Sequence, residues 1–303
     1  MKKKYTPDHF AHVCQKGDHG NVLFYCTRDR LVYFTLFCTE AARFKIRPLA
    51  LSLMFTHTHA FLQAANHEGL NDFVVTVGKR YAREFNRNAG LQGRVFLKPY
   101  VYSLKRQDKE INSCYIYIAN NSAEKQLFCR AEEDRWTFLA YLDKVFPFSE
   151  YVPLRKASKA YRRSLSLVNG VHKQGKPLSY RSLERIFQPL DPRERERMTD
   201  EIIQMYSVLD YEAVLRRFGS YKALLQLVHT SSGADYDLKE EWRKESDIPY
   251  RKACRILQES GYDLAEKAFL AQPLPNDLLR MILRRSGLSP YQFELFFHLK
   301  ADR

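Results

Sequence analysis

The sequence predicts an α+β protein in which an antiparallel sheet with helices on one face is followed by an all-α C-terminal domain. Along residues 10–121, apolar runs of strand length alternate with helical periodicity in the order strand, helix, strand pair, helix, strand, helix. Beyond Gly175 the pattern is helical throughout. We therefore divide the 303 residues into a domain at 1–130, a basic helical connector at 131–175 and a helical accessory domain at 176–303.

The composition favours a folded protein that binds nucleic acid. Hydrophobic residues make up 45% of the chain, the formal net charge is +14 and the pI is about 9.4. Excess lysine and arginine attract polyanions by releasing counterions. No apolar run is long enough to span a bilayer and no apolar core follows Met1 to Lys4, so we expect no membrane partner and a cytoplasmic location. The cysteines form no Cys-x-x-Cys pair, which argues against a zinc ribbon.

The first elements follow from the spacing of their apolar residues. A strand is expected at 10–15, and a short apolar return at 21–25 follows a glycine-containing link. At 27–43 the apolar residues recur at helical spacing. Two apolar strands, at 46–55 and 57–64, come next and are joined by a tight connection.

The second helix is expected to begin after Asn71, a residue type that caps helix N-termini, and to end at the glycines of 90–93. One side is apolar and the other is basic. The basic side includes Lys79, Arg80 and Arg83. A strand at 94–103 and a helix at 108–121 complete the region, and a further helix is expected at 136–145.

His57 and His59 stand two residues apart in an otherwise apolar strand. Side chains at this spacing point to the same face, with Thr58 turned away. Neutral imidazole is the commonest protein ligand for a divalent ion, and one strand holds two of them at a fixed spacing. The alternative is that each histidine is a half-buried strand residue hydrogen-bonded to a neighbour, and the motif alone leaves both readings open.

The helix at 108–121 carries a second group of interest. Its predicted core stripe consists of Ile111, Cys114, Tyr115 and Ile118. Tyr117 lies about a third of a turn from the middle of that stripe, and Asn121 shares its row at i+4. An aromatic side chain off the stripe has no evident packing role, and a carboxamide can coordinate a metal. The alternative is a surface tyrosine beside a C-capping asparagine.

Together these residues could cut and join DNA. A tyrosine hydroxyl is a poor nucleophile because its pKa is about 10. A divalent ion, Mg²⁺ or Mn²⁺, held by His57, His59 and Asn121 would polarise a phosphodiester, so that Tyr117 could attack phosphorus and hold the DNA as a phosphotyrosine. The energy of the cleaved bond is then conserved, which suits strand transfer as well as cutting.

An ordered set of motifs runs through residues 10–127. The motifs are His12-Val13-Cys14, Leu23-Phe24, Leu53-Met54-x-x-His57-x-His59, Tyr81-Ala82-Arg83-Glu84-Phe85-Asn86, Gly93-Arg94-Val95-Phe96 and Tyr117-Ile118-x-x-Asn121. In this order and at this spacing they resemble the single-tyrosine HUH transposases of insertion sequences and, within them, the REP-associated tyrosine transposases. The chain departs from the family pattern at Thr58 and Ser122.

The resemblance implies a sheet like that of an RNA-recognition motif or a ferredoxin. It implies that His57 and His59 are the HUH metal ligands, that Asn121 is the third ligand, and that Tyr117 is the nucleophile that forms a 5′-phosphotyrosine link. The implied substrate is single-stranded DNA beside a foldback hairpin, and the protein would act as a monomer or homodimer. The alternative is a non-catalytic, domesticated relative that binds repeat or hairpin DNA as a regulator.

Basic and aromatic residues outside these motifs could contact the DNA, with aromatic rings stacking on bases. The candidates are Lys79, Arg80, Arg83, Arg94, Phe96, Lys98, Tyr100, Arg155, Lys159, Arg162 and Arg163. The last four could equally be a solvated face. Residues 277–300 have the outline of a helix-turn-helix with Gln292 and His298 as base-reading residues, or of a plain helical hairpin.

Overall fold

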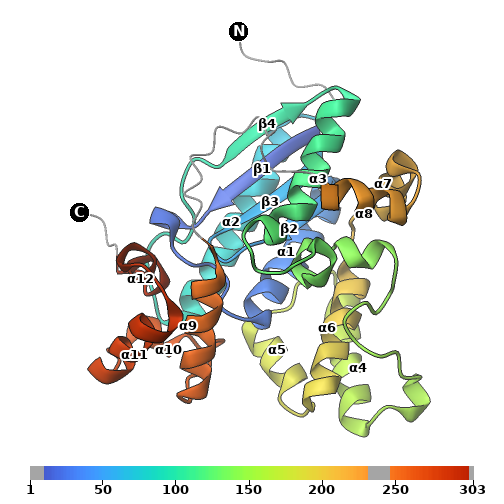
Figure 1. The fold of residues 1–303 in the computed structure, drawn as a ribbon. Coiled ribbons are helices and arrows are strands. Elements are labelled where there is room, and N and C mark those ends of the chain that lie inside the picture. The colour runs from blue at the N-terminus through green and yellow to red at the C-terminus, as the bar shows by residue number, and fades with distance from the viewer. Residues whose placement is uncertain (1–9, 231–245, 300–303) are drawn as a thin grey trace.

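A small antiparallel sheet forms the centre of the protein. The computed structural model describes residues 10–230 and 246–299. Within them the sheet has four strands in the order β2-β3-β1-β4 (Figure 1). The strands are β1 (Phe10–Lys16), β2 (Arg47–Leu53), β3 (His57–Gln63) and β4 (Val101–Lys105). All pairings are antiparallel, so the predicted α+β class and its antiparallel sheet are confirmed.

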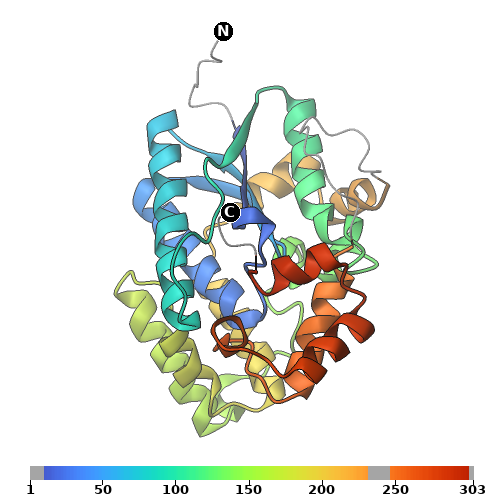
Figure 2. The same ribbon diagram turned by 90° about the vertical axis from the view of Figure 1, so that its left-hand side faces the viewer.

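Helices cover both faces of the sheet. α1 (Thr27–Phe44) and α2 (His67–Ala89) pack on one face, and α3 (Asp108–Glu124) packs on the other. Figure 2 shows α2 and α3 on opposite sides of the strands. The prediction of helices on one face is therefore wrong. The reason lies in β3, where consecutive residues Phe61 and Leu62 point to opposite faces and are both fully buried, so each face needs a cover.

The two ends of α2 are set by a capping asparagine and a glycine. Asn66, rather than the expected Asn71, caps the helix, and its side-chain oxygen accepts a hydrogen bond from the Gly69 backbone nitrogen at 2.7 Å. The C-terminal prediction is confirmed, because Gly90 ends the helix in the left-handed conformation with φ of 67°.

One expected strand is displaced and shorter, and the predicted apolar return is a loop. The strand expected at 94–103 is confined to Val101–Lys105. Pro99 has no N–H to donate to a ladder, and before it only Phe96 makes a bridge, to Gly17. The apolar return at 21–25 is a loop after a short 3₁₀ turn, η1 (Asp18–Gly20), and is held by the Leu23 backbone nitrogen donating to Phe55.

The segment after α3 is built from short turns instead of the helix expected at 136–145. These turns are η2 (Ala131–Glu133), η3 (Arg135–Thr137), η4 (Leu139–Leu142) and η5 (Leu154–Lys156). Phe138 separates η3 from η4 with φ of 59°, a left-handed conformation that stops a helix.

The remaining described chain is helical, as predicted. Its helices are α4 (Lys159–Lys173), α5 (Tyr180–Phe187), α6 (Pro192–Tyr206), α7 (Tyr211–Phe218), α8 (Tyr221–Thr230), α9 (Ile248–Glu259), α10 (Ala268–Ala271), α11 (Asn276–Ser286) and α12 (Pro290–Phe296). The predicted starts are confirmed, because Ser179, Asp191 and Ser289 each accept a hydrogen bond from the first turn of their helix. α5 and α6 pack on α1, whereas α7 and α8 reach β2 and α3.

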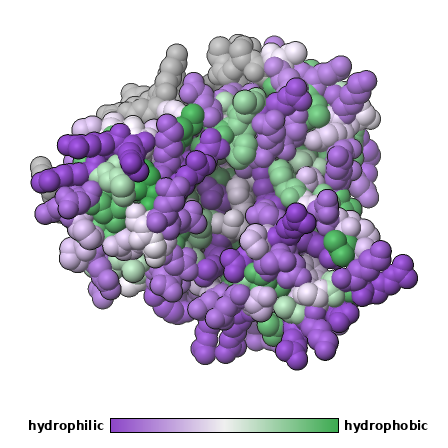
Figure 3. All heavy atoms as spheres, turned by 60° about the horizontal axis from the view of Figure 1, so that its bottom comes forward, coloured by the Kyte–Doolittle hydropathy of each residue, from purple (hydrophilic) through white to green (hydrophobic). Residues whose placement is uncertain are grey.

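A cavity of about 950 Å³ lies between α5 and α6 on one side and α9 on the other. Figure 3 shows the bottom of the molecule hollowed near its centre, with hydrophilic side chains around most of the rim. Across residues 10–230 and 246–299, every helix is too short or too polar to cross a membrane.

Candidate active site between the sheet and α3

The two histidines of the motif share one face of β3, as predicted. His57 is 3% exposed and His59 is fully buried, and both face α3. Thr58 points to the opposite face, where its hydroxyl lies 3.4 Å from that of Tyr33. The two imidazole rings have centroids 4.9 Å apart. The alternation of a strand therefore places two potential ligands side by side on the face that α3 covers.

A third histidine, His12 of β1, joins this pair. Its Nε2 lies 2.9 Å from Nδ1 of His59, and its ring is 2% exposed. His12 belongs to the first motif of the resemblance, but it was not among the predicted site residues. The missed signal was strand alternation, because His12, Cys14 and Lys16 share the parity that faces α3.

The hydrogen bonds of the histidines set the orientation of both ligand rings. Nδ1 of His57 lies 3.0 Å from the Thr56 hydroxyl. If Nε2 is to bind a metal, Nδ1 must carry the proton, so His57 donates to Thr56 in the same way that His59 donates to His12. Metal-binding histidines commonly have such a partner on the second nitrogen, and the partner fixes the tautomer.

Tyr117 reaches the histidines from α3. Its ring centroid lies 5.5 Å from that of His59 and 5.8 Å from that of His12, both edge-on. The expectation that Tyr117 lacks a packing role is wrong, since it is only 7% exposed. The reason is that two sides of α3 are covered, because Tyr117 packs on His12 and His59 of the sheet whereas Tyr115 packs on Phe218 of α7. Burial here nevertheless brings the phenol against the histidines of the same chain.

Asn121 lies on the same row of α3, one turn beyond Tyr117, and is 3% exposed. One further turn along the row, Lys125 acts electrostatically on both His57 and His59. At one end of this row, Tyr117 contacts His12 and His59. At the other end, Lys125 lies near enough to His57 and His59 to act on them electrostatically. Asn121, between them, is placed on the side of α3 that faces the pair.

Burial and positive charge keep the histidines neutral. Burial lowers the pKa of His57 well below its usual range, and the charges of Lys125 and Lys16 lower it further. Burial does the same to His59, reinforced by the other two histidines and both lysines. The pKa of His12 falls to about 3 through burial and then the charge of Lys105. Lys16 and Lys125 were not among the predicted site residues.

Two imidazoles and one amide oxygen are ligand types that would suit a divalent ion. Neutral imidazole is the form that binds metals, and each ring engages its Nδ1 in a hydrogen bond, so Nε2 would be the atom that binds an ion. Among the described residues, no three side chains of His, Cys, Asp and Glu are grouped to hold a metal. The candidate set therefore depends on Asn121 as its third member.

The structure does not bring the predicted DNA-contacting residues to this site. Lys79 and Arg83 are exposed on α2, on the opposite face of the sheet. Arg80 instead forms a salt bridge with the buried carboxylate of Glu40. Phe96, expected to stack on a base, is buried between Tyr33 and Tyr81. Tyr100 is half-buried, and its hydroxyl donates a hydrogen bond to Oδ1 of Asn71. The other predicted residues are exposed elsewhere on the protein, and they are Arg94, Lys98, Arg155, Lys159, Arg162 and Arg163.

The hairpin of α11 and α12 has the predicted glycine turn, with Gly287 at φ of 76°. Its proposed base-reading residues are nevertheless used internally. Gln292 is 4% exposed and donates to the carbonyl of Ser246. His298 is bonded through Nε2 to the Val22 carbonyl. The assignment of these two side chains to base reading is therefore wrong.

The His57 end of the site is closed by the chain that precedes α9. The Lys125 carbonyl accepts hydrogen bonds from the Ser246 hydroxyl at 3.3 Å and the Asp247 backbone nitrogen at 3.4 Å. Burial raises the pKa of Asp247 to about 6, against the opposing charges of Lys125 and Arg30. The helical C-terminal region thus packs directly on the end of α3 that approaches the histidines.

Comparisons of the chain with protein-family models, with curated proteins and with solved structures gave no match.

Proposed function

We propose that this protein is a metal-dependent DNA transesterase that cleaves and joins single-stranded DNA beside a hairpin, with Tyr117 as its nucleophile. One observation carries the proposal. The phenol of Tyr117 and the imidazoles of His57 and His59 come from separate elements and meet between α3 and the sheet, with ring centroids of Tyr117 and His59 5.5 Å apart. Apolar side chains at these buried positions would stabilise the packing of α3 on the sheet better than a phenol and imidazoles do.

The proposed reaction is a transesterification. A bond forms between the Tyr117 oxygen and phosphorus while the bond from phosphorus to the 3′ oxygen breaks. The phenolic proton is released and the departing 3′ oxygen takes one up, so atoms and charge balance. The DNA is left on Tyr117 through its 5′ phosphate, and the reverse reaction joins strands. A divalent ion held by His57, His59 and Asn121 would supply polarisation and charge neutralisation of the phosphate.

Two lysines support a phosphate-binding role. Lys16 at the end of β1 and Lys125 just after α3 both act electrostatically on His57 and His59. Their charge would attract the DNA backbone and oppose protonation of the imidazoles, so both effects favour a neutral metal site beside an anion.

The test is formation of a covalent adduct with hairpin-bearing single-stranded DNA in the presence of Mg²⁺ or Mn²⁺. We expect an adduct that survives denaturing electrophoresis and is lost in Tyr117→Phe. Tyr33→Phe is the matched control, because Tyr33 is also buried but its hydroxyl lies on the opposite face of the sheet, near Gln15 and Thr58. An equal yield of adduct in Tyr117→Phe would remove Tyr117 from the mechanism.

A second candidate function is DNA binding without cleavage, as in a regulator that recognises repeat or hairpin DNA. Burial favours it, since His59 is fully buried and Tyr117 is 7% exposed, and a phosphodiester must displace neighbouring groups to reach them. Tight, salt-sensitive binding of the hairpin with no adduct under Mg²⁺ or Mn²⁺ would support this function and overturn the catalytic one.

A further inference from the structure

The α3 face of the sheet continues past the histidines into a pocket of about 520 Å³. Strand alternation links the two places. Phe10 follows the parity of His12 on β1, and Phe61 follows that of His59 on β3. Two residues along a strand span about 7 Å, so the pocket begins next to the Tyr117 site. Neither His59 nor Tyr117 lines it.

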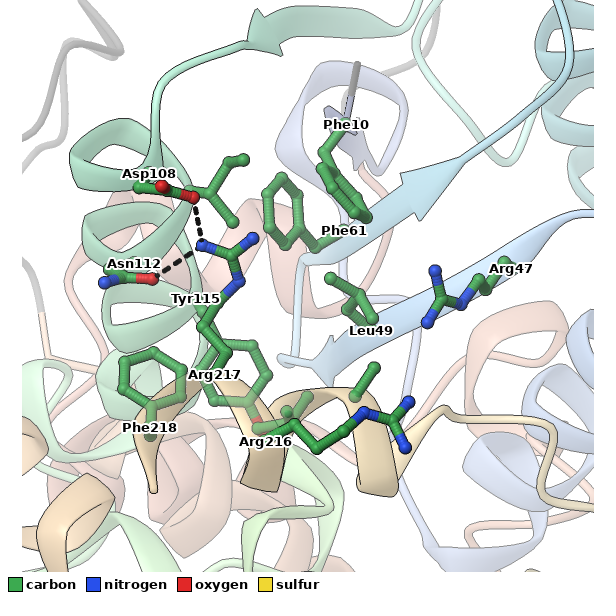
Figure 4. Close-up of a pocket in the computed structure, with 13 residues that line it drawn as sticks. Phe10, Arg47, Leu49, Phe61, Asp108, Asn112, Tyr115, Arg216, Arg217 and Phe218 are labelled. Atoms are coloured by element: carbon green, nitrogen blue, oxygen red, sulfur yellow. Dashed lines mark hydrogen bonds and ion pairs between the residues drawn. The ribbon is translucent and has the colours of Figure 1, made fainter. Parts of the chain in front are cut away.

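The floor of the pocket is aromatic and apolar. The rings of Phe10 and Phe61 lie 5.2 Å apart, and those of Tyr115 and Phe218 lie 5.4 Å apart. Leu49 lies beside Phe61 (Figure 4). A flat, weakly polar group would lie favourably on such a floor, because aromatic surfaces stack on rings of any base type.

Arginines surround this floor. Arg217 reaches from α7 to Asp108 at 2.7 Å and to Asn112 at 3.2 Å, as Figure 4 shows. Arg47 and Arg216 lie on the side away from α3. Arg47 pairs with Asp210 at 2.6 Å, and Arg216 pairs with Glu212 at 3.4 Å.

The Arg216 pair is the one that can be exchanged for a ligand. Both of its side chains are largely exposed, at 67% and 87%, so the ion pair is screened by water and contributes little to stability. Arg216 is thus available to an anion. Arg217 of α7, in contrast, is held against α3 by its hydrogen bonds to Asp108 and Asn112. An aromatic floor with cations at its edge matches a ligand that is flat on one side and anionic on the other.

We infer that this pocket binds one nucleotide of single-stranded DNA next to the scissile phosphate, with its base on the Phe218 side and its backbone phosphate on Arg216. The inference rests on the proposed function, because it names where the strand attacked by Tyr117 continues. It also gives a role to α7, which lies outside the resemblance seen in the sequence and contributes Arg216, Arg217 and Phe218 to the pocket.

The experiment measures binding of a fluorescent single-stranded octanucleotide to the full chain by anisotropy, in a Tyr117→Phe background so that cleavage does not interfere. Phe218→Leu keeps most of the volume and all of the charge but removes the ring, and we expect Kd to rise about 5- to 150-fold. Arg216→Gln is expected to reduce the slope of log Kd against log salt by about 0.7, the value for one phosphate contact of a single strand.

Matched controls are Phe293→Leu and Arg284→Gln, which make the same changes in α12 and α11, away from the pocket. Both should bind like the parent, and unchanged melting temperatures would show that each variant is folded. Equal binding by Phe218→Leu and the parent would overturn the inference, even where Arg216→Gln weakens binding, because an electrostatic contact alone is then sufficient.

The inference and the proposed function fail in different ways. If the protein with Tyr117 intact forms the adduct but the pocket variants bind like the parent, the catalytic proposal stands and the pocket assignment falls. If no adduct forms but Phe218→Leu weakens binding as expected, the pocket is a nucleotide site of a non-catalytic DNA-binding protein.

Discussion

The two faces of the sheet use the same strands for different purposes. Towards α1 and α2, β1 and β3 present residues such as Val13 and Leu62, which belong to the large apolar core. Towards α3 they present His12, His57 and His59 beside Tyr117. One residue step along a strand separates a side chain that stabilises the fold from one that can do chemistry. Substitutions on the α1 and α2 face should therefore lower stability without removing the DNA adduct. Substitutions on the α3 face should remove the adduct.

The largest expected effect on stability is that of Leu62→Ala. Leu62 is fully buried in the core on the α1 and α2 face, so its truncation leaves a cavity and should lower the free energy of unfolding by about 2–5 kcal/mol. Urea denaturation followed by circular dichroism measures the loss. Leu227→Ala on α8 is the control, because Leu227 is 45% exposed and its truncation should change stability by less than about 0.5 kcal/mol.

A loss below about 1 kcal/mol for Leu62→Ala would mean that this face tolerates a cavity and would weaken the contrast. The contrast also requires that the folded fraction of Leu62→Ala forms adduct like the parent. Loss of adduct in fully folded Leu62→Ala would show that the packed face also controls the chemistry.

Much of this arrangement follows from local sequence patterns. The period of two fixes the shared face of His57 and His59, and glycine at position 90 predicts the end of α2. The i+4 spacing correctly placed Asn121 on the row of Tyr117, and both are buried on α3. Such features depend on a few neighbouring residues, which is why the sequence alone suffices for them.

Other features depend on contacts between distant segments. Helical periodicity ranks the rows of α3 by hydrophobicity, but it does not reveal that the row of Tyr117 lies against His12 and His59 of the sheet and is buried there. The pairing of His12 with His59 joins β1 and β3 across 47 residues. In the same way, Arg80 reads as a free surface cation until Glu40 of α1 is placed beside it. In each case the prediction failed because the contacting residue is distant in the sequence and is not part of the local pattern.

A second prediction sharpens the contrast by adding metal to the α3 face. Mn²⁺ at 100 times its Kd should stabilise the protein against unfolding by about 2.7 kcal/mol, because the ion binds the folded state. His59→Asn should remove this increment, since it removes a proposed ligand. His12→Asn should weaken Mn²⁺ binding by about 10- to 100-fold, because it removes only the partner that orients the His59 ring.

The control for this measurement is Leu62→Ala, which should start from a lower stability and still gain the full Mn²⁺ increment. An increment that persists in His59→Asn would place the ion elsewhere and would contradict the proposed ligand set. Melting curves with and without Mn²⁺ report this directly, without any DNA substrate.

The smallest expected effect compares two tyrosines on opposite faces. The hydroxyl of Tyr33 lies 3.3 Å from Oε1 of Gln15 and 3.4 Å from the Thr58 hydroxyl, on the face of α1. Tyr33→Phe should therefore cost about 1 kcal/mol, the net value of a buried hydrogen bond, and leave adduct formation unchanged. Tyr117→Phe should abolish the adduct. If instead Tyr33→Phe reduced the adduct in fully folded protein, the chemistry would extend through Thr58 to both faces of β3, and the separation of the two faces would fail.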